Sequence, residues 1–498
     1  MVTMLWVLCI LQCMFHMPVA GGCNVEERIA LMRIRSSLLE ANSEVPASWG
    51  QSGDCCSWER VRCNNSKRVS DLNLYCQATV DAEGCSNWNL SLTIFSWFHE
   101  LQLLDLSSNF ACFQDFDGLQ GVTKLRYLDL SDNSLTGNNI FESLGKLPSL
   151  EVINIHSSSM SGALQDSAFR NLKKLRKLHL GSNQLNGSIP PSLFELARLE
   201  YLDLSEFKKK GHIPITLSSN LSSSLQTLKL SANNLNGTFD FFWLRNCTML
   251  KNIDLSRNAD LAIDVKFWGY VPKFQLRKLM LSGCNLDTSI IAGPNFLGTQ
   301  LHLQILDLSN NNLAGSLPDW IFRNEASLVY LDLANNSLVG SLNLMWQRQS
   351  NLQMVNISKN RFVGQLPTNI SSVFPNLTVL DASYCCISRD LQPSLCNISR
   401  LAYMDLSNNK LTGEVPPGLF TNCSELKILK LSNNNLGGTI LSGVRNLSFI
   451  SAIYLASNNF EGALPNYLSG HLEIMDLHDN KLSGELDVYS GIFLHCKF

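Results

Sequence analysis

The stretch Leu125–Gly137 reads L-R-Y-L-D-L-S-D-N-S-L-T-G, and its pattern L-x-x-L-x-L-x-x-N-x-L returns at steps of 24 to 27 residues along most of the chain. The last step, from Ile450 to Leu472, is 22 residues. A fixed period of this length predicts a solenoid, in which each unit buries its apolar face only against its neighbours. The copies begin at Leu101, Leu125, Leu150, Leu175, Leu199, Leu225, Leu250, Leu276, Leu303, Leu328, Leu352, Leu377, Leu401, Leu426, Ile450 and Leu472.

Each copy predicts the same local structure. L-x-x-L-x-L indicates a short strand whose leucines point inward, while the residues between them face the other side. Stacked copies then form one parallel sheet. The Asn in the ninth place is expected to turn the chain off the strand and to hydrogen-bond the backbone of adjacent loops. Cys284 and Cys385 occupy that place and are predicted to be buried thiols, whereas Ser158 and Phe207 depart from the pattern.

The period and pattern are typical of the leucine-rich repeat. Two further motifs narrow the resemblance. The first is L-x-G-x-I/L/V-P after the Asn, as in Leu185–Pro190, Leu313–Pro318 and Leu411–Pro416. The second is C-N-V-E-E-R-I-A-L-M at Cys23–Met32, followed by D-C-C-S-W-E-R-V-R-C at Asp54–Cys63. Together they closely resemble the plant extracellular leucine-rich repeat family, in particular its receptor-like proteins.

That resemblance covers the chain from Cys23 to Gly484. It implies an α/β solenoid that winds into a right-handed, horseshoe-like superhelix with a concave parallel β-sheet, a second small sheet and an N-terminal disulfide cap. In the family the cap pairs the first Cys with the first of the C-C pair, which implies Cys23–Cys55 and Cys56–Cys63 here.

The chain is expected to have four parts. Residues 1–22 hold an apolar run and small residues before Cys23, which predicts a signal peptide. Residues 23–68 form the cap. Within the cap, Asn24 is expected to begin a helix with Glu27 as its reaching carboxylate, followed by an apolar stripe at Ile29, Leu31, Met32, Ile34, Leu38 and Leu39. Residues 69–484 form about 17 repeats. Residues 485–498 are expected to be irregular, as in a truncated product.

Export to the cell surface or beyond is predicted on two grounds. Fourteen of the 16 cysteines follow residue 22, which fits an oxidising compartment. N-glycosylation sequons are dense. No stretch after residue 22 is apolar enough for a membrane helix. The sequons lie at Asn64, Asn89, Asn186, Asn220, Asn236, Asn246, Asn335, Asn356, Asn369, Asn376, Asn397, Asn422 and Asn446.

The third, fifth, seventh and eighth residues of each copy should face the concave side. Asp recurs in the fifth place, and we interpret it as repeat consensus rather than as an acidic site, because identical environments do not split pKa values. Departures from consensus are the candidate ligand-binding residues, since aromatic and cationic side chains offer contact area at little ordering cost. They are His156, Lys177, His179, Tyr201, Lys229 and Arg257, and further along Tyr330, Tyr403, Lys430, Tyr454 and His478. A glycan on Asn356, in the fifth place, would block the concave side locally.

The predicted function is extracellular recognition of a peptide, protein or oligosaccharide on the concave face. As the resemblance implies, a membrane co-receptor kinase would pass on the signal, in defence or development. The alternative is a soluble inhibitor of secreted cell-wall hydrolases that is similar to polygalacturonase inhibitors. With 16% charged residues, a net charge of −3 and Lys208–Lys210 as the one basic block, no nucleic-acid partner is expected. No catalytic motif, cofactor or metal site is predicted, so we do not expect an enzyme.

Overall fold

The computed structural model describes residues 23–51, 53–76, 88, 90–136, 140–207, 211–212, 221–267, 271–291, 296–322, 327–342, 348–442, 444, 446–447, 449–464, 469–470, 472–483 and 493–495. The predicted signal peptide, Lys208–Lys210 and the sequons at Asn89 and Asn220 lie outside these residues. The chain divides into two compact units, Met1–Thr216 and Leu217–Phe498. Each unit is built on its own run of repeats.

Unit 1 begins with the cap. Helix α2 (Val25–Glu40) starts where Asn24 Oδ1 accepts the backbone N–H groups of Glu26 and Glu27. Of the predicted stripe, Leu31, Ile34 and Leu38 are buried, but Ile29 and Leu39 are exposed. The predicted apolar stripe is therefore wider than the buried face of α2, because it included Ile29 and Leu39. A helix that covers the end of a solenoid needs only one narrow apolar face.

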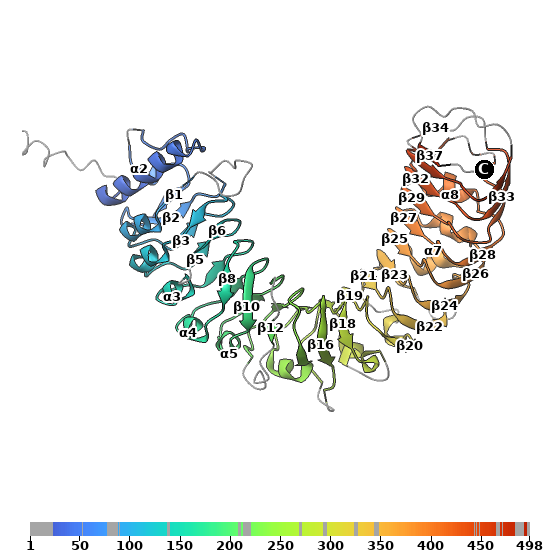
Figure 1. Ribbon diagram of the computed structural model, residues 1–498, viewed down its shortest axis with the longest axis horizontal. Helices are drawn as coiled ribbons and strands as arrows, with labels where there is room; N and C mark the ends of the chain where they lie inside the picture. The colour runs from blue at the N-terminus through green and yellow to red at the C-terminus, as the bar shows by residue number, and fades with distance from the viewer. Residues whose placement is uncertain are drawn as a thin grey trace, which may run out of the picture. The chain divides into compact units, whose positions relative to one another are not determined.

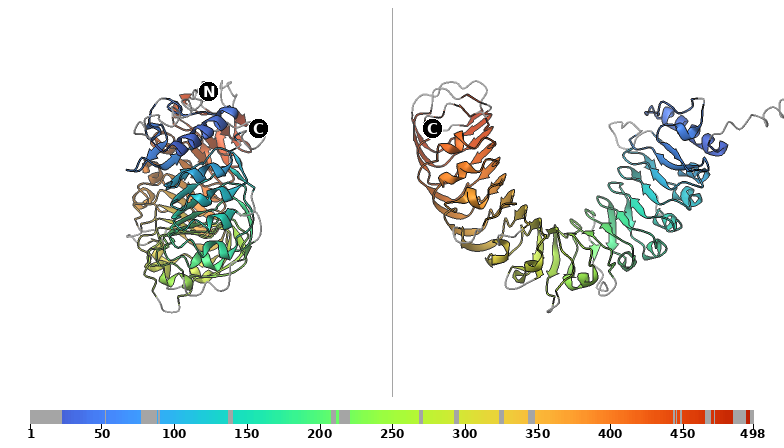
Figure 2. Two further views of the ribbon diagram at one scale, coloured as in Figure 1. Left: turned by 90° about the vertical axis from the view of Figure 1, so that its left-hand side faces the viewer. Right: turned by 180° about the vertical axis from the view of Figure 1, so that it is seen from behind.

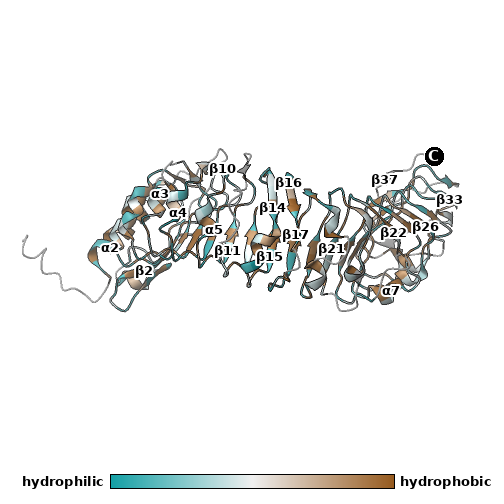
Figure 3. Cartoon of the chain, turned by 90° about the horizontal axis from the view of Figure 1, so that it is seen from below, coloured by the Kyte–Doolittle hydropathy of each residue, from teal (hydrophilic) through white to brown (hydrophobic). Residues whose placement is uncertain are grey.

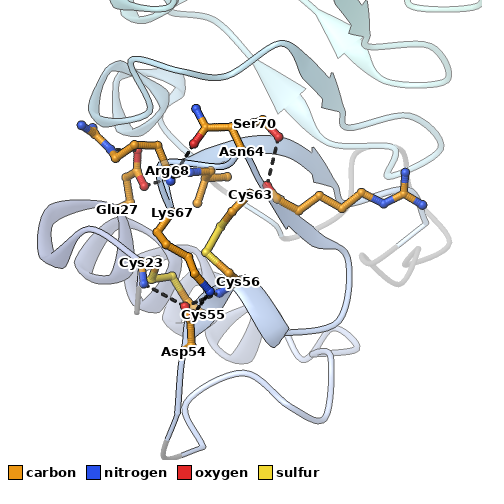
Figure 4. The surroundings of a disulfide bond; sticks show 12 residues. Cys23, Glu27, Asp54, Cys55, Cys56, Cys63, Asn64, Lys67, Arg68 and Ser70 are labelled. Atoms are coloured by element: carbon orange, nitrogen blue, oxygen red, sulfur yellow. Dashed lines mark hydrogen bonds and ion pairs between the residues drawn. A yellow bond between two sulfur atoms is a disulfide. The ribbon is translucent and has the colours of Figure 1, made fainter. Parts of the chain in front are cut away.

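The implied disulfides of the cap are confirmed. Cys23 bonds Cys55 and Cys56 bonds Cys63, and Asp54 lies beside them (Figure 4). Asp54 Oδ1 accepts the backbone N–H groups of Cys23 at 2.8 Å and Cys56 at 2.9 Å. Burial opposes ionisation of Asp54, but these bonds and Lys67 outweigh it and lower its pKa.

The expected role of Glu27 is wrong. Its carboxylate accepts Arg68 Nε at 2.8 Å and the backbone N–H of Val69 at 3.0 Å, instead of reaching back to Asn24. Val69 opens the first strand of the repeats. The bond to the N–H of Val69 is favoured over a bond to Asn24, because a buried backbone N–H without an acceptor costs free energy.

Among the residues that the structure describes, the main sheet of unit 1 contains six parallel strands, preceded by β1 (Val61–Cys63), which pairs antiparallel with β2. Figure 1 shows these strands side by side in blue to green. The six strands are β2 (Val69–Asn73), β3 (Leu103–Asp105), β5 (Tyr127–Asp129), β7 (Val152–Asn154), β9 (Lys177–His179) and β11 (Tyr201–Asp203).

Unit 2 repeats the arrangement with twelve parallel strands in the part of it that the structure describes, seen from behind in the right-hand view of Figure 2. The predicted solenoid fold, with its parallel sheet, is confirmed. The strands are β13 (Thr227–Lys229), β15 (Asn252–Asp254), β17 (Lys278–Met280), β19 (Ile305–Asp307), β21 (Tyr330–Asp332), β23 (Met354–Asn356), β25 (Val379–Asp381), β27 (Tyr403–Asp405), β29 (Ile428–Lys430), β32 (Ala452–Tyr454), β35 (Ile474–Asp476) and β37 (Phe493–His495).

Strand β37 corrects one expectation. The segment after Gly484 was predicted to be irregular, but Phe493–His495 pairs in parallel register with β35, Leu494 opposite Met475. The pairing satisfies the backbone groups on the free side of β35, which would otherwise be exposed at the sheet edge.

Short strands after the Asn turns form the predicted second layer. In unit 1 these are β4 (Cys112–Phe113), β6 (Ser134–Leu135), β8 (Ser161–Ala163), β10 (Gln184–Ser188) and β12 (Gly211–His212). In unit 2 they are β14 (Gly237–Asp240), β16 (Asn258–Asp264), β18 (Cys284–Leu286), β20 (Ala314–Ser316), β22 (Ser337–Ser341), β24 (Arg361–Gly364), β26 (Cys386–Asp390), β28 (Lys410–Thr412), β30 (Gly437–Thr439), β33 (Asn459–Gly462) and β36 (Lys481–Leu482). Two further short strands, β31 (Asn446–Leu447) and β34 (Ser469–Gly470), lie later in their copies and pair with each other.

Helical turns complete the repeats. In unit 1 they are η1 (Cys55–Ser57), η2 (Leu92–Trp97), η3 (Phe116–Gly121), α3 (Ile140–Leu144), α4 (Asp166–Phe169) and α5 (Pro191–Phe194). In unit 2 they are η4 (Phe241–Asn246), η5 (Thr288–Ile290), η6 (Phe296–Thr299), η7 (Asp319–Phe322), α7 (Ile370–Val373), η8 (Pro393–Asn397) and α8 (Gly418–Thr421).

The core of each unit is a stack of leucines closed by a ladder of asparagines. The inward residues of the strands are buried, and Figure 3 shows brown and teal residues mixed along each strand, as alternation requires. Asn360 is typical of the ladder: its Nδ2 donates to the carbonyl oxygens of Leu333 at 2.9 Å and Ile357 at 3.0 Å. The buried substitutes behave as predicted, because Cys284 Sγ donates to Leu255 O and Cys385 Sγ donates to Ile357 O.

Candidate recognition surface

The candidate recognition surface is the side of the main sheet that carries the third, fifth, seventh and eighth residues of each copy, here called the open face. In β23 and β29 the third- and fifth-place residues on this face are half-buried and the residue between them is buried. In β19 and β27 the fifth-place aspartate is buried as well. The rest of each repeat fixes the backbone beneath it. Side chains on the open face are therefore presented by a rigid, regularly spaced scaffold.

Asp in the fifth place is used by the fold itself. Asp405 Oδ1, for example, accepts the backbone N–H of Ser407 at 3.0 Å and its hydroxyl at 2.6 Å. The same pair of bonds recurs at Asp105, Asp129, Asp203, Asp307 and Asp381. These bonds give the acidic row a structural role, as its interpretation as repeat consensus implies.

Asp332 differs from the other fifth-place aspartates in its hydrogen bonds and its pKa, and this difference was not predicted from sequence. The seventh residue of its copy is Ala334, so Asp332 receives the backbone N–H at 2.9 Å but no serine hydroxyl. Burial, with a smaller contribution from Asp307, raises the pKa of Asp332 to about 6. Tyr330 donates its hydroxyl to the same carboxylate at 3.4 Å, and burial raises the pKa of Tyr330 to about 12. The missing Ser in L-D-L-A was the available sequence signal.

The first candidate patch lies partly in each unit. In unit 1, His179 stacks on Tyr201 with ring centroids 4.2 Å apart, and Lys177 pairs in register with Tyr201. His156 is exposed in the preceding copy, beside the backbone of Gly181. In unit 2, Lys229 ends β13, and exposed Arg257 follows β15. Each part places its residues on the open face.

The second candidate set contains a close cluster on three adjacent strands, here called the Lys430 sandwich: Tyr403, Asp405, Lys430 and Tyr454. Lys430 Nζ lies 5.2 Å from the ring centroid of Tyr403 and 5.6 Å from that of Tyr454. It is also 3.8 Å from Asp405 Oδ2. Burial opposes the charge, but these neighbours outweigh it and raise the pKa of Lys430. The sandwich therefore holds a fixed cation between two aromatic faces.

Two members of the second set lie apart from the sandwich. Tyr330 is on β21 and bonds Asp332. His478 follows β35, and its Nδ1 lies 2.5 Å from Asp476 Oδ1.

An apolar row runs beside the sandwich and was not identified from sequence. The third residues of eight consecutive strands of unit 2 pair in register across the open face. Most are half-buried, and Ile474 at the end is 37% exposed. The sequence signal of this row is a hydrophobic residue in the third place, between the apolar residues of the first and fourth places of each copy. The row consists of Ile305, Tyr330, Met354, Val379, Tyr403, Ile428, Ala452 and Ile474.

The sequons differ in exposure. Asn246, Asn335, Asn369, Asn397 and Asn422 are exposed. Asn64, Asn186, Asn236, Asn356 and Asn376 are half-buried, while the side chain of Asn446 lies outside the described residues. Asn335 and Asn356 are the two on the open face, in the eighth and fifth places of consecutive copies.

Comparison with known proteins identifies the repeats. Residues 25–64 match the leucine rich repeat N-terminal domain. Residues 142–206 and 399–460, and also 124–147 and 302–324, match leucine rich repeat models. The matched segments of the chain are leucine-rich repeats. It is homologous to plant receptor-like proteins, as its motifs indicated.

Receptor-like protein 15 of Arabidopsis thaliana is 30% identical over 379 residues, which cover 62% of this chain and 38% of that protein. Receptor-like protein 14 of the same plant is 29% identical over 61% of this chain and 39% of its own length. Cuscuta receptor 1 of Solanum lycopersicum is 30% identical over 45% of this chain and 21% of its own length. This leucine-rich repeat chain thus spans less than half the length of these relatives.

Solved structures share the leucine-rich repeat fold. The TDR receptor superimposes with a TM-score of 0.62 at 24% identity, over 78% of this chain and 66% of that one. The ectodomain of the membrane receptor kinase GASSHO1/SCHENGEN3 from Arabidopsis thaliana, in complex with Casparian strip integrity factor 2, has a TM-score of 0.52 at 26% identity, over 90% of this chain and 64% of that one. Among the described residues of the present chain, no helix has the length and apolar character needed to cross a bilayer.

Proposed function

We propose that this leucine-rich repeat protein is an extracellular recognition protein that binds an extended peptide on the open face of unit 2. Homology to receptor-like proteins supports recognition in general. The similar receptor-kinase ectodomain in complex with Casparian strip integrity factor 2 supports a protein or peptide ligand. The disulfides of the cap support an oxidising, extracytoplasmic environment.

The Lys430 sandwich is the observation that carries the proposal. A lysine between two tyrosine rings is pre-organised, so an arriving carboxylate meets an ordered cation rather than a mobile one. The apolar row continues from Tyr403 to Ile428 and Ala452 on the neighbouring strands. A ligand with an acidic group next to apolar side chains, in extended conformation, would satisfy both features. Peptides offer that combination, whereas neutral oligosaccharides lack the acidic group.

Signal transmission is the second part of the proposal. As the resemblance to receptor-like proteins implies, the ligand-bound chain would recruit a membrane co-receptor that carries a kinase domain. Ligand-dependent co-purification from plant membranes tests this part separately from binding.

The binding test uses the secreted, glycosylated chain and short synthetic peptides. Two peptide pools are matched in apolar content, one acidic and one basic, and binding is measured by surface plasmon resonance. We expect binders from the acidic pool, with affinity reduced about tenfold or more by Lys430→Ala, since a charge-assisted contact is worth roughly 1.5–3 kcal/mol.

Lys427→Ala is the matched control for this test. Lys427 is exposed in the second place of the same copy, outside the open face. Binding that is equally weakened by both variants, or unaffected by Lys430→Ala, contradicts the proposal.

A further inference from the structure

A groove of about 990 Å³ lies in unit 2 on residues that belong to no strand of the main sheet. Its walls come from the end of β26, from η8 and from the segment around α8, in consecutive copies. The volume is in the range of sites that hold small molecules. The groove is separate from the open face, so it calls for an occupant other than the proposed peptide.

Arg389 at one wall stands where most other copies have glycine. Its φ is +74°, and the neighbouring copies place Gly364 at +87° and Gly413 at +75° in the same turn. A residue with a Cβ is strained in this region, and strain of this kind is retained where a side chain serves a purpose. Within the described residues the guanidinium of Arg389 has no hydrogen-bond or ion-pair partner. The turn therefore directs an unpaired five-donor group to the groove.

Asn422 at the other wall is the asparagine of an N-C-S sequon and is exposed. Thr421 Oγ1 donates to its Oδ1 at 2.9 Å, which fixes the orientation of the amide. Its Nδ2 then lies over Gly418, only 3.3 Å from where a Cβ would be. Gly418 also lines the groove. The atom that accepts an N-linked glycan thus lies at the groove wall formed by Gly418, next to the side chain of Cys396.

The remaining lining suits a saccharide. Gln365 and Gln392 supply amides that both donate and accept, as sugar hydroxyls require. Pro416 and Pro417 supply flat apolar surface for the C–H faces of sugar rings.

We propose that Asn422 is glycosylated and that the first sugars of its glycan lie in this groove, held by Arg389, Gln365 and Gln392. During attachment Asn422 Nδ2 bonds the anomeric carbon of the first sugar and loses one proton. The bond from that carbon to the diphosphate of a lipid-linked oligosaccharide breaks, and the lipid diphosphate leaves. A bound glycan would tie three consecutive repeats together, those of Gln365, of Arg389 and Gln392, and of Asn422.

The test uses the chain secreted from eukaryotic cells. Glycopeptide mass spectrometry first measures occupancy of Asn422. The folded protein is then treated with a peptide N-glycosidase, and the rate of glycan release at Asn422 is compared with that at exposed Asn369, which is outside the groove. We expect release at Asn422 to be about tenfold slower, as if one or two hydrogen bonds must break first.

Arg389→Gly is the matched variant, because Gly fits the backbone at this turn and folding is not endangered. It should accelerate release at Asn422 and leave Asn369 unchanged. An unoccupied Asn422, equal release rates at the two sites, or no effect of Arg389→Gly would each overturn the proposal. None of these outcomes bears on peptide binding at the open face.

Discussion

The carboxylate of Asp332 accepts the backbone N–H of Ala334 at 2.9 Å and lacks the hydroxyl that Ser407 gives to Asp405 at 2.6 Å. Burial raises the pKa of Asp332 to about 6, above the ordinary value of an aspartate. The folded state thus favours the protonated form. Stability contributed by this group is present at low pH and is lost as pH rises from the unfolded pKa through about 6.

Ala334→Ser is therefore expected to stabilise unit 2 at neutral pH. The new hydroxyl supplies a donor to the ionised carboxylate, worth roughly 1–2 kcal/mol. The gain should vanish near pH 4, where Asp332 is protonated in the folded state. Urea unfolding between pH 4 and 8 measures both effects.

The control for that change is Ala456→Ser. Ala456 occupies the same seventh place and is buried, but the fifth residue of its copy is Tyr454 rather than Asp. A hydroxyl there finds no carboxylate and should give no pH-dependent gain. An equal gain from both variants would show that the pKa of Asp332 is not the cause.

Glu27→Gln is expected to loosen the cap. Glu27 is fully buried, and its carboxylate holds both Arg68 and the N–H of Val69. The amide keeps one acceptor but leaves Arg68 without its counter-charge, at a cost of about 2 kcal/mol. Amide hydrogen exchange resolved to the peptides of α2 and β2 measures the loss.

Glu26→Gln serves as the control for the cap. Glu26 is adjacent and exposed, and its backbone N–H is already bonded to Asn24. The free energies of opening obtained from exchange in the Glu26 variant should stay within about 0.5 kcal/mol of those of the unchanged chain. Faster exchange in the Glu26 variant alone would contradict the assigned role of Glu27.

Asn360→Ala tests the ladder that joins the repeats. The substitution leaves the carbonyls of Leu333 and Ile357, and the backbone N–H of Leu338, without their side-chain partner. Several buried groups lose a bond together, so we expect a loss of roughly 2–3 kcal/mol in urea unfolding. Gln353→Ala, at an exposed second place of the same copy, should cost little. Equal losses would mean that the ladder does not stabilise the stack.

The sequence predicted features that repeat, because each copy reports them independently. The strands, the buried leucines and the Asn ladder follow from period and spacing, including Cys284 and Cys385 as buried substitutes. The two disulfides of the cap followed from the resemblance. Contacts that occur only once in the chain were harder to predict from sequence. Glu27 was expected to reach back to Asn24, and only the structure shows that its carboxylate bonds Arg68 and the backbone N–H of Val69 at the start of β2.

The candidate site shows the same difference between residues that sequence could identify and arrangements that it could not. Tyr403, Lys430 and Tyr454 were identified as departures from consensus, but the sandwich depends on the register of three strands that are far apart in sequence. Tyr330 and Tyr403 were identified individually, but the apolar row was missed because its other members are ordinary hydrophobic residues in their own copies. It becomes a feature only when the parallel register aligns eight of them.

Glycan occupancy on the open face provides a last prediction. Asn356 Nδ2 donates to Asp332 Oδ2 at 3.2 Å, and its Oδ1 accepts the hydroxyl of Ser358 at 2.7 Å. The Asn356 amide joins β23 to β21 through this bond to Asp332, and a glycan on Nδ2 would disrupt it. We expect Asn356 to be unmodified, whereas exposed Asn335 is expected to carry a glycan.

Glycopeptide mass spectrometry of the secreted chain measures both sites. Asn335→Gln should remove one glycan from the intact mass, and Asn356→Gln should remove none. If Asn335 is occupied, its glycan stands beside β21, and the peptide must bind between β25 and β35, where the Lys430 sandwich lies. A glycan on Asn356 would instead cover the apolar row at Met354, and peptide binding along the whole row would be untenable.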